Sequence, residues 1–285
     1  MTRVYINILF SILIISTAFS QYNPGARQIA LANSDAGLSN DAFAVFTNPA
    51  GLSQMNWSEI GLYYSPAPFG FTEMANGFIA YHKPFSFGSI GLGGMTYGFD
   101  LYRESRFTAA YSFNYKNNFF LGASLNYHSV SIKRYGSAGA LYADIGGLLY
   151  LADFLRWGFF IHNINHATFG SYDDQIPVEL NAGLSVDIRP DISFNAAIDK
   201  DIRYNASISA GLEYSVIRYL ILRSGFSNEP SRYTAGIGIQ YSFIEVDYAI
   251  FTHPDLGMTH QAGLIINFGS DETRQAKIRK HLGIE

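Results

Sequence analysis

The sequence predicts an all-β fold: a transmembrane antiparallel β-barrel of about 14 strands with an N-terminal plug segment. Segments of about ten residues alternate polar and apolar side chains along most of the 285-residue chain. Charged residues make up only 15% of the chain, whereas aromatic residues reach 16%. Beyond the first twenty residues there is no apolar run of the ~18 residues that a spanning helix needs.

Alternation is clearest in Pro177–Asp187, Tyr204–Tyr214 and Phe119–His128. Because side chains point to opposite faces of a strand in turn, each segment has one apolar and one polar face. The polar faces carry mostly Gly, Ser, Asn and Thr, which suits a narrow lumen better than the open surface of a secreted β-sandwich or propeller, the alternative fold. Aromatic residues at strand ends, among them Tyr63 and Tyr64, are predicted to lie at the lipid–water boundaries.

Fourteen strands are predicted, an even number as in most bacterial outer-membrane barrels. Their expected ranges are Trp57–Ser65, Ala75–Lys83, Phe87–Gly98, Ser105–Tyr115, Asn118–Val130, Ala140–Leu151, Arg156–Asn165, Pro177–Arg189, Asp191–Asp199, Tyr204–Ser215, Arg218–Ser227, Arg232–Ser242, Phe243–Phe251 and Met258–Phe268.

Four regions follow along the chain. Residues 1–20 are predicted to be a signal peptide, because Arg3 precedes an apolar stretch and small residues flank a cleavage site before Gln21; the alternative is a membrane anchor. Residues 21–55 alternate poorly and form the plug segment, and residues 56–268 form the barrel. Residues 269–285 are predicted to be a solvated, charged periplasmic tail with a short helix at Glu272–His281, or alternatively a docking handle for a periplasmic partner.

Signatures of catalysis are missing from the sequence. The chain has no Cys, no GxSxG nucleophile elbow and no HExxH metal site. We therefore expect no catalytic residue, no cofactor, no metal site and no enzyme activity. The net charge of −4 argues against a nucleic-acid-binding protein, which would carry a basic surface.

Charged residues within the predicted strands fall on the polar faces. A Lys or Arg on the lipid face costs about 2–4 kcal/mol at mid-membrane, so these charges are expected to face the lumen. Arg223 is expected to pair with Glu213 or Asp247, either to brace the interior or to bind a ligand. The lumen charges are Asp144, Glu179, Asp187, Asp199, Glu213, Arg223, Glu245 and Asp247.

Several short motifs resemble the FadL-like outer-membrane proteins, and more closely their PorV/PorQ branch. They include Gly25-Ala26-Arg27, Asp35-Ala36 and Asn48-Pro49-Ala50-Gly51-Leu52 ahead of the first strand, and Leu222-Arg223-Ser224-Gly225-Phe226 later in the chain. The resemblance covers nearly all of 21–268. It implies that Asn48, Pro49, Ala50 and Gly51 form a plug motif inside the barrel; the alternative is that they only form the turn into the first strand.

The same resemblance implies a bacterial outer-membrane location and an accessory role in type IX protein secretion. The expected partners are outer-membrane lipid and exported proteins or components of the secretion channel. The protein partners are expected to be contacted through Tyr102–Arg106, Lys133–Gly139 and Ile164–Ile176. The alternative function is that of a FadL-like passive transporter of hydrophobic small molecules.

Overall fold

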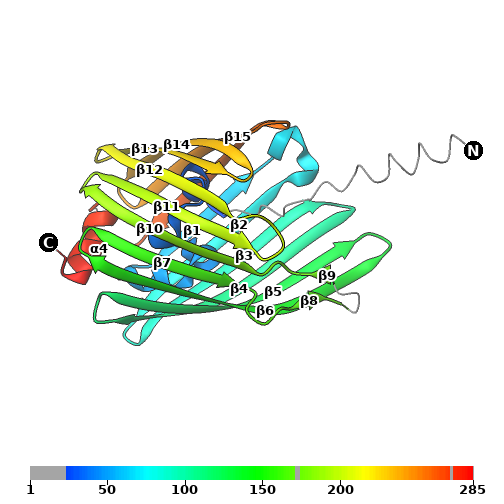
Figure 1. The fold of residues 1–285 in the computed structure, drawn as a ribbon, viewed down its shortest axis with the longest axis horizontal. Helices are drawn as coiled ribbons and strands as arrows, with labels where there is room; N and C mark the ends of the chain where they lie inside the picture. The colour runs from blue at the N-terminus through cyan, green and yellow to red at the C-terminus, as the bar shows by residue number, and fades with distance from the viewer. Residues whose placement is uncertain (1–23, 171–173, 270–271, 285) are drawn as a thin grey trace, which may run out of the picture.

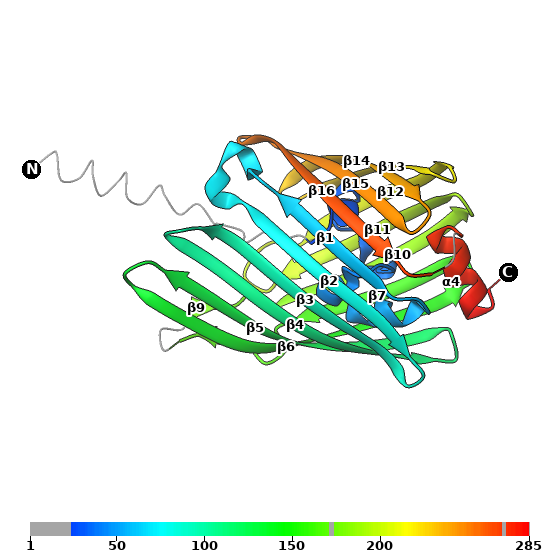
Figure 2. The same ribbon diagram turned by 180° about the vertical axis from the view of Figure 1, so that it is seen from behind.

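The computed structural model describes residues 24–170, 174–269 and 272–284, and it confirms the predicted barrel. Fourteen antiparallel strands close into one wall in the order β1-β16-β15-β14-β13-β12-β11-β10-β7-β6-β5-β4-β3-β2 (Figures 1 and 2). The wall strands are β1 (Glu59–Ser65), β2 (Asn76–Phe85), β3 (Gly88–Phe99), β4 (Tyr102–Tyr115), β5 (Phe119–Ile132), β6 (Gly136–Ala152), β7 (Leu155–His162), β10 (Glu179–Arg189), β11 (Ile192–Asp201), β12 (Ser207–Ile217), β13 (Leu220–Asn228), β14 (Ser231–Tyr241), β15 (Ile244–His253) and β16 (Gly257–Asn267).

The first and last wall strands close the barrel. β1 pairs with β16 from Glu59↔Asn267 to Tyr64↔Ala262. Each wall strand overlaps one of the predicted strands. The connection from β7 to β10 holds a small separate hairpin that the sequence did not predict, β8 (Thr168–Phe169) paired with β9 (Asp174–Gln175).

The two ends of the barrel differ in their connections. At one end, the turn end, strands are joined by two or three residues, as at Asp153–Phe154 and Arg218–Tyr219. The other end, the loop end, carries the two longest connections, 66–75 and 163–178. Short turns are typical of the periplasmic side of outer-membrane barrels.

The three ranges expected to contact a partner all lie at the loop end. Ile164–Ile176 belongs to the long connection, but only residues 133–135 of Lys133–Gly139 lie outside strands. Tyr102–Arg106 was predicted as a connection and is instead the start of β4. Because β4, β5 and β6 are longer than their neighbours, residues predicted as loops extend the pairing of the wall.

Apolar side chains cover the outer face of the wall. Leu180, Leu184, Ile208, Leu212 and Ile237 are 36% to 54% exposed there. Their neighbours in the same strands point inward, as period-two alternation requires. No helix in the described ranges is both long and apolar enough to cross a membrane.

Tyr63 does not lie at a lipid–water boundary as predicted. Its ring points inward and packs edge-to-face on Phe78, with ring centroids 5.7 Å apart, and it is buried. Tyr64, its neighbour on the outer face, is 55% exposed. The inner face of β1 is apolar at this point because it packs against other side chains rather than against water.

The strands of the wall surround the residues that precede β1, here called the front segment (residues 24–55), as Figures 1 and 2 show. Nearly all of its residues are buried. The predicted signal peptide and residues 21–23 lie outside the described residues. The front segment contains α2 (Ala26–Ala30), η1 (Asp35–Gly37), α3 (Ala44–Thr47) and η2 (Pro49–Gln54). The other helices of the described ranges are η3 (Pro68–Gly70) and η4 (Thr72–Met74) in the β1–β2 connection, and α4 (Arg274–Leu282) after β16.

The alternation of faces predicts a labelling pattern. The chain has no native cysteine, so single cysteine variants report one position each. A lipid-soluble thiol reagent should label L184C and L212C in bilayers and leave E213C unlabelled, because residues 212 and 213 lie on opposite faces of β12. Labelling of E213C instead of L212C would contradict the register.

Candidate functional site

A belt of small residues lines the inside of the wall. Each of the fourteen wall strands contributes at least one inward-facing glycine or alanine, and one from each is taken here. Strand pairing joins many of them directly, as in Gly122↔Gly146 and Gly158↔Gly183. The small-residue belt consists of Gly61, Ala80, Gly93, Ala110, Gly122, Gly146, Gly158, Gly183, Ala197, Gly211, Gly225, Gly236, Ala249 and Gly263.

The belt lets the backbone of the front segment approach the backbone of the wall. A Cβ atom added at Gly122 would lie 2.3 Å from the Ala50 nitrogen, and one at Gly158 would lie 2.1 Å from the Ala36 oxygen. Distances under 3.0 Å cannot be accommodated unless something shifts. A larger side chain at these belt positions would therefore displace the front segment, because packed interiors have no spare volume.

The residues of the expected plug motif fasten the front segment to the wall. The Asn48 side chain donates to the Gly147 carbonyl of β6 at 3.2 Å and accepts from the Ala50 nitrogen at 3.2 Å, which caps η2. Pro49 occupies the first turn of η2, where its missing N–H costs nothing. The Ala50 carbonyl accepts from Ser112 of β4 at 2.9 Å. The motif thus contacts the wall besides leading into β1.

Gly51 completes the motif through a second close approach. A Cβ atom at Gly51 would lie 1.8 Å from the Ser39 carbonyl oxygen. Two turns of the front segment therefore pack backbone against backbone at this point.

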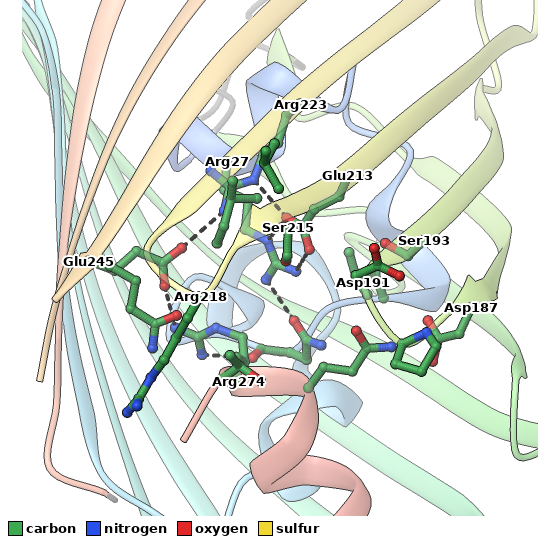
Figure 3. Close-up of a pocket in the computed structure, with 18 of the residues that line it drawn as sticks. Arg27, Asp187, Asp191, Ser193, Glu213, Ser215, Arg218, Arg223, Glu245 and Arg274 are labelled. Carbon is green, nitrogen blue, oxygen red and sulfur yellow. Dashed lines mark hydrogen bonds and ion pairs between the residues drawn. The ribbon is translucent and has the colours of Figure 1, made fainter. Parts of the chain in front are cut away.

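A buried ionic cluster joins the front segment to β12, β13 and β15 (Figure 3). Arg27 of α2 donates to Glu213 through Nε at 2.8 Å and Nη2 at 2.9 Å. Arg223 of β13 donates to the same carboxylate at 2.6 Å and to Glu245 at 3.0 Å, and it also contacts Asp247. Hydrogen bonds between guanidinium and carboxylate groups are about twice as strong as neutral ones.

Arg274 of α4 extends the cluster across the turn end. Its guanidinium donates to Glu59 of β1 at 2.6 Å, to Glu245 of β15 at 3.1 Å and to the Asn40 carbonyl at 2.9 Å. One side chain from the tail thus contacts two wall strands and the front segment.

The helix α4 is not the solvated tail that the sequence predicts. Ile278 and Leu282 pack in the same apolar core as the front segment. Lys277 donates to Asn267 at 3.0 Å and lies 4.3 Å from the ring centroid of Trp57. Burial and the nearby Arg274 guanidinium lower the pKa of Lys277 to about 8. The tail therefore closes over the turn end of the barrel.

The structure brings together four of the eight predicted lumen charges, namely Glu213, Arg223, Glu245 and Asp247. The other four lie elsewhere on the inner face. Asp144 accepts from Ser124, Asn126 and His162; Asp187 pairs with Arg156; Asp199 accepts from Asn181 at 2.6 Å; Glu179 is exposed near the loop end of β10.

Sequence reasoning missed three members of the cluster: Arg27, Glu59 and Arg274. A signal for Arg27 was present, because it is the only Lys or Arg between residues 21 and 82. A lone cation in a segment that enters a lumen needs a partner there. Glu59 lies within the predicted strand Trp57–Ser65 but was not singled out as a lumen charge, and Arg274 lies beyond the last predicted strand.

A cavity of about 380 Å³ lies next to the ionic cluster at the turn end (Figure 3). The front segment, strands of the wall and the start of α4 all line it, including Arg27, Asp187, Glu213 and Arg274. Among the described residues no group of three or more His, Asp or Glu side chains is arranged to hold a metal ion. The cavity is therefore a space lined by charged side chains of both signs.

Solved structures with the same architecture include two toluene transporters and a FadL homologue. The toluene transporter TbuX of Ralstonia pickettii superposes with a TM-score of 0.65 at 12% identity, over 88% of this chain and 98% of that chain. The P. putida toluene transporter TodX gives 0.61 at 15% identity over 85% and 96%. A Pseudomonas aeruginosa FadL homologue gives 0.56 at 15% identity over 86% and 97%.

These likenesses show that the chain has a FadL-like barrel fold, as the sequence motifs implied. At 12% to 15% identity they concern the fold alone. No protein-family model and no curated protein matches the chain. The PorV/PorQ branch stays a prediction.

The small-residue belt predicts a strong effect of one added methyl group. G122A should lower the free energy of unfolding by about 1–3 kcal/mol, because the new Cβ would overlap the Ala50 backbone. It should also expose the buried Arg27 to trypsin by loosening the front segment. A123V, which enlarges an exposed residue beside it, is the matched control. Equal urea midpoints in lipid vesicles for the two variants would contradict the role of the belt.

The ionic cluster predicts that replacing a buried arginine lowers stability more than replacing an exposed one. R223Q should destabilise the barrel by about 3–5 kcal/mol, because Asp247 and its neighbours lose a buried partner. R189Q removes an arginine whose side chain is 63% exposed and should change stability by less than about 1 kcal/mol. Urea unfolding in vesicles measures both, and similar losses would show that the cluster does not act as a buried unit.

Proposed function

We propose that the chain is a passive transporter of small molecules across the bacterial outer membrane. The observation that carries the proposal is a closed barrel whose lumen is filled by its own front segment and which keeps a cavity of about 380 Å³ at the turn end. A filled lumen excludes bulk flow, whereas a cavity of this size accommodates a small solute.

The fold supports this proposal over the secretion role. The structures with the same fold include toluene transporters. The apolar outer face of the wall fits lipid, the partner that we propose for it. Nothing in the comparisons supports a part in type IX secretion, so that expectation stays a prediction, as does the absence of enzyme activity. The hydrophobic class of substrate was implied only by the sequence resemblance, and it is not part of this proposal.

Flux into proteoliposomes tests the proposal. Vesicles containing the purified barrel should take up at least one class of small solute faster than protein-free vesicles. G122A serves as an internal comparison, since a loosened front segment should raise uptake of every permeant solute. Uptake equal to that of protein-free vesicles for hydrophobic and polar solutes alike would refute a transport function.

A further inference from the structure

The cavity lies at the turn end of the barrel. Pro190 and Asp191 of the β10–β11 turn and Arg218 of the β12–β13 turn line it, together with Thr273 and Gln275 at the start of α4. Residues of turns and of the tail thus line this end of the cavity. If short turns face the periplasm, a solute held here lies at the periplasmic exit of the lumen.

The lining carries charges of both signs. Five arginines and four carboxylates border the cavity, and no aromatic side chain does. A hydrocarbon in this space would remove charged groups from water and offer them no hydrogen bond in return, which is unfavourable. Without an aromatic ring there is also no flat apolar face for a planar ligand. The lining favours a solute that carries charge itself.

Two buried donors of the lining lack an acceptor. Within the described part of the chain, Arg156 Nε and Gln275 Nε2 have no hydrogen-bond partner. Arg156 is held in place by its other end, where Nη2 donates to Ser185 at 2.9 Å and contacts Asp187. Buried donors that lose water and gain no acceptor are unfavourable.

Carboxylates lie beside these donors. Asp187 lines the cavity and pairs with Arg156, and Asp191 lines it from the adjoining turn, where it pairs with the exposed Arg189. A solute with a carboxylate at one end and an ammonium at the other would meet complementary groups at both. Its net charge of zero would also leave the balance of the buried ionic cluster unchanged.

We propose that this cavity binds small zwitterions of the size of an amino acid or a dipeptide. The carboxylate of the solute accepts from Arg156 and Gln275, and its ammonium group contacts Asp187 and Asp191. The volume of about 380 Å³ lies within the range of small-molecule pockets. This inference rests on the proposed transport function, for which it names the substrate class.

Solute class is tested first. Glycyl-alanine, arabinose and toluene are compared for uptake into proteoliposomes and for binding to the detergent-solubilised barrel by calorimetry. Glycyl-alanine should bind and enter faster than arabinose, and toluene should not displace it. Equal behaviour of the dipeptide and the sugar would overturn the proposal, as would displacement by toluene.

A pair of variants on α4 tests the donor. Q275E keeps the size of the side chain but replaces the amide donor by a carboxylate, and it should weaken dipeptide binding about tenfold, the effect of one hydrogen bond to a charged group. A276E adds the same charge at the next residue, which is exposed, and should bind as the unaltered protein does. Equal affinities for Q275E and A276E would overturn the assignment of the donor.

A second pair tests the space itself. S215W places a large side chain in the cavity, whereas S224W places one on the outer face of the neighbouring strand. S215W alone should abolish dipeptide binding; retained binding would overturn the location. If the dipeptide binds but no solute crosses, the transport function fails and the site stands. If solutes cross without saturable dipeptide binding, the site fails and transport stands.

Discussion

The interior of this barrel depends on how closely two stretches of backbone approach each other. Residues without a side chain beyond Cβ line the wall at the level where the front segment passes, and at Gly158 a single added carbon would overlap the Ala36 carbonyl. Close packing of this kind leaves neither stretch room to move independently. The front segment is therefore a second layer of the wall rather than an object loosely enclosed by it.

This close approach determines where charge can be buried. Arg27 reaches Glu213 only because α2 lies against the wall, and the same carboxylate then accepts from Arg223. Each ion in the cluster would be unfavourable alone, and each is acceptable because several partners surround it. Arg274 brings the tail into the same arrangement. The position of α4, which covers the turn end, thus depends on the position of the front segment.

Much of the wall could be predicted from the sequence because alternation of polar and apolar residues is a local property. All wall strands overlap predicted ones for this reason. Tyr63 was misplaced because the rule that aromatic rings lie at the lipid boundary assumes a wet inner face, whereas the inner face of β1 is apolar beside the front segment. The burial of the tail was not predicted, because two of the four residues on its buried face are cationic, a composition typical of a solvent-exposed helix. These residues are Arg274, Lys277, Ile278 and Leu282. The partners of the tail lie far away in the chain, and nothing in the nine residues of α4 indicates them.

The pairing of β1 with β16 has a consequence for how the molecule can be assembled. This seam joins the first and last strands of the barrel wall; the front segment precedes β1, and α4 follows β16. The residues around Ala26 and Ala30 precede all wall strands in the sequence, yet they contact Gly236 of β14 and Gly263 of β16. The front segment therefore cannot complete its packing until β14 and β16 have joined the wall. Packing of the front segment and pairing of β1 with β16 therefore occur together. The helix α4 contacts both of these strands, so it can dock only after they have paired.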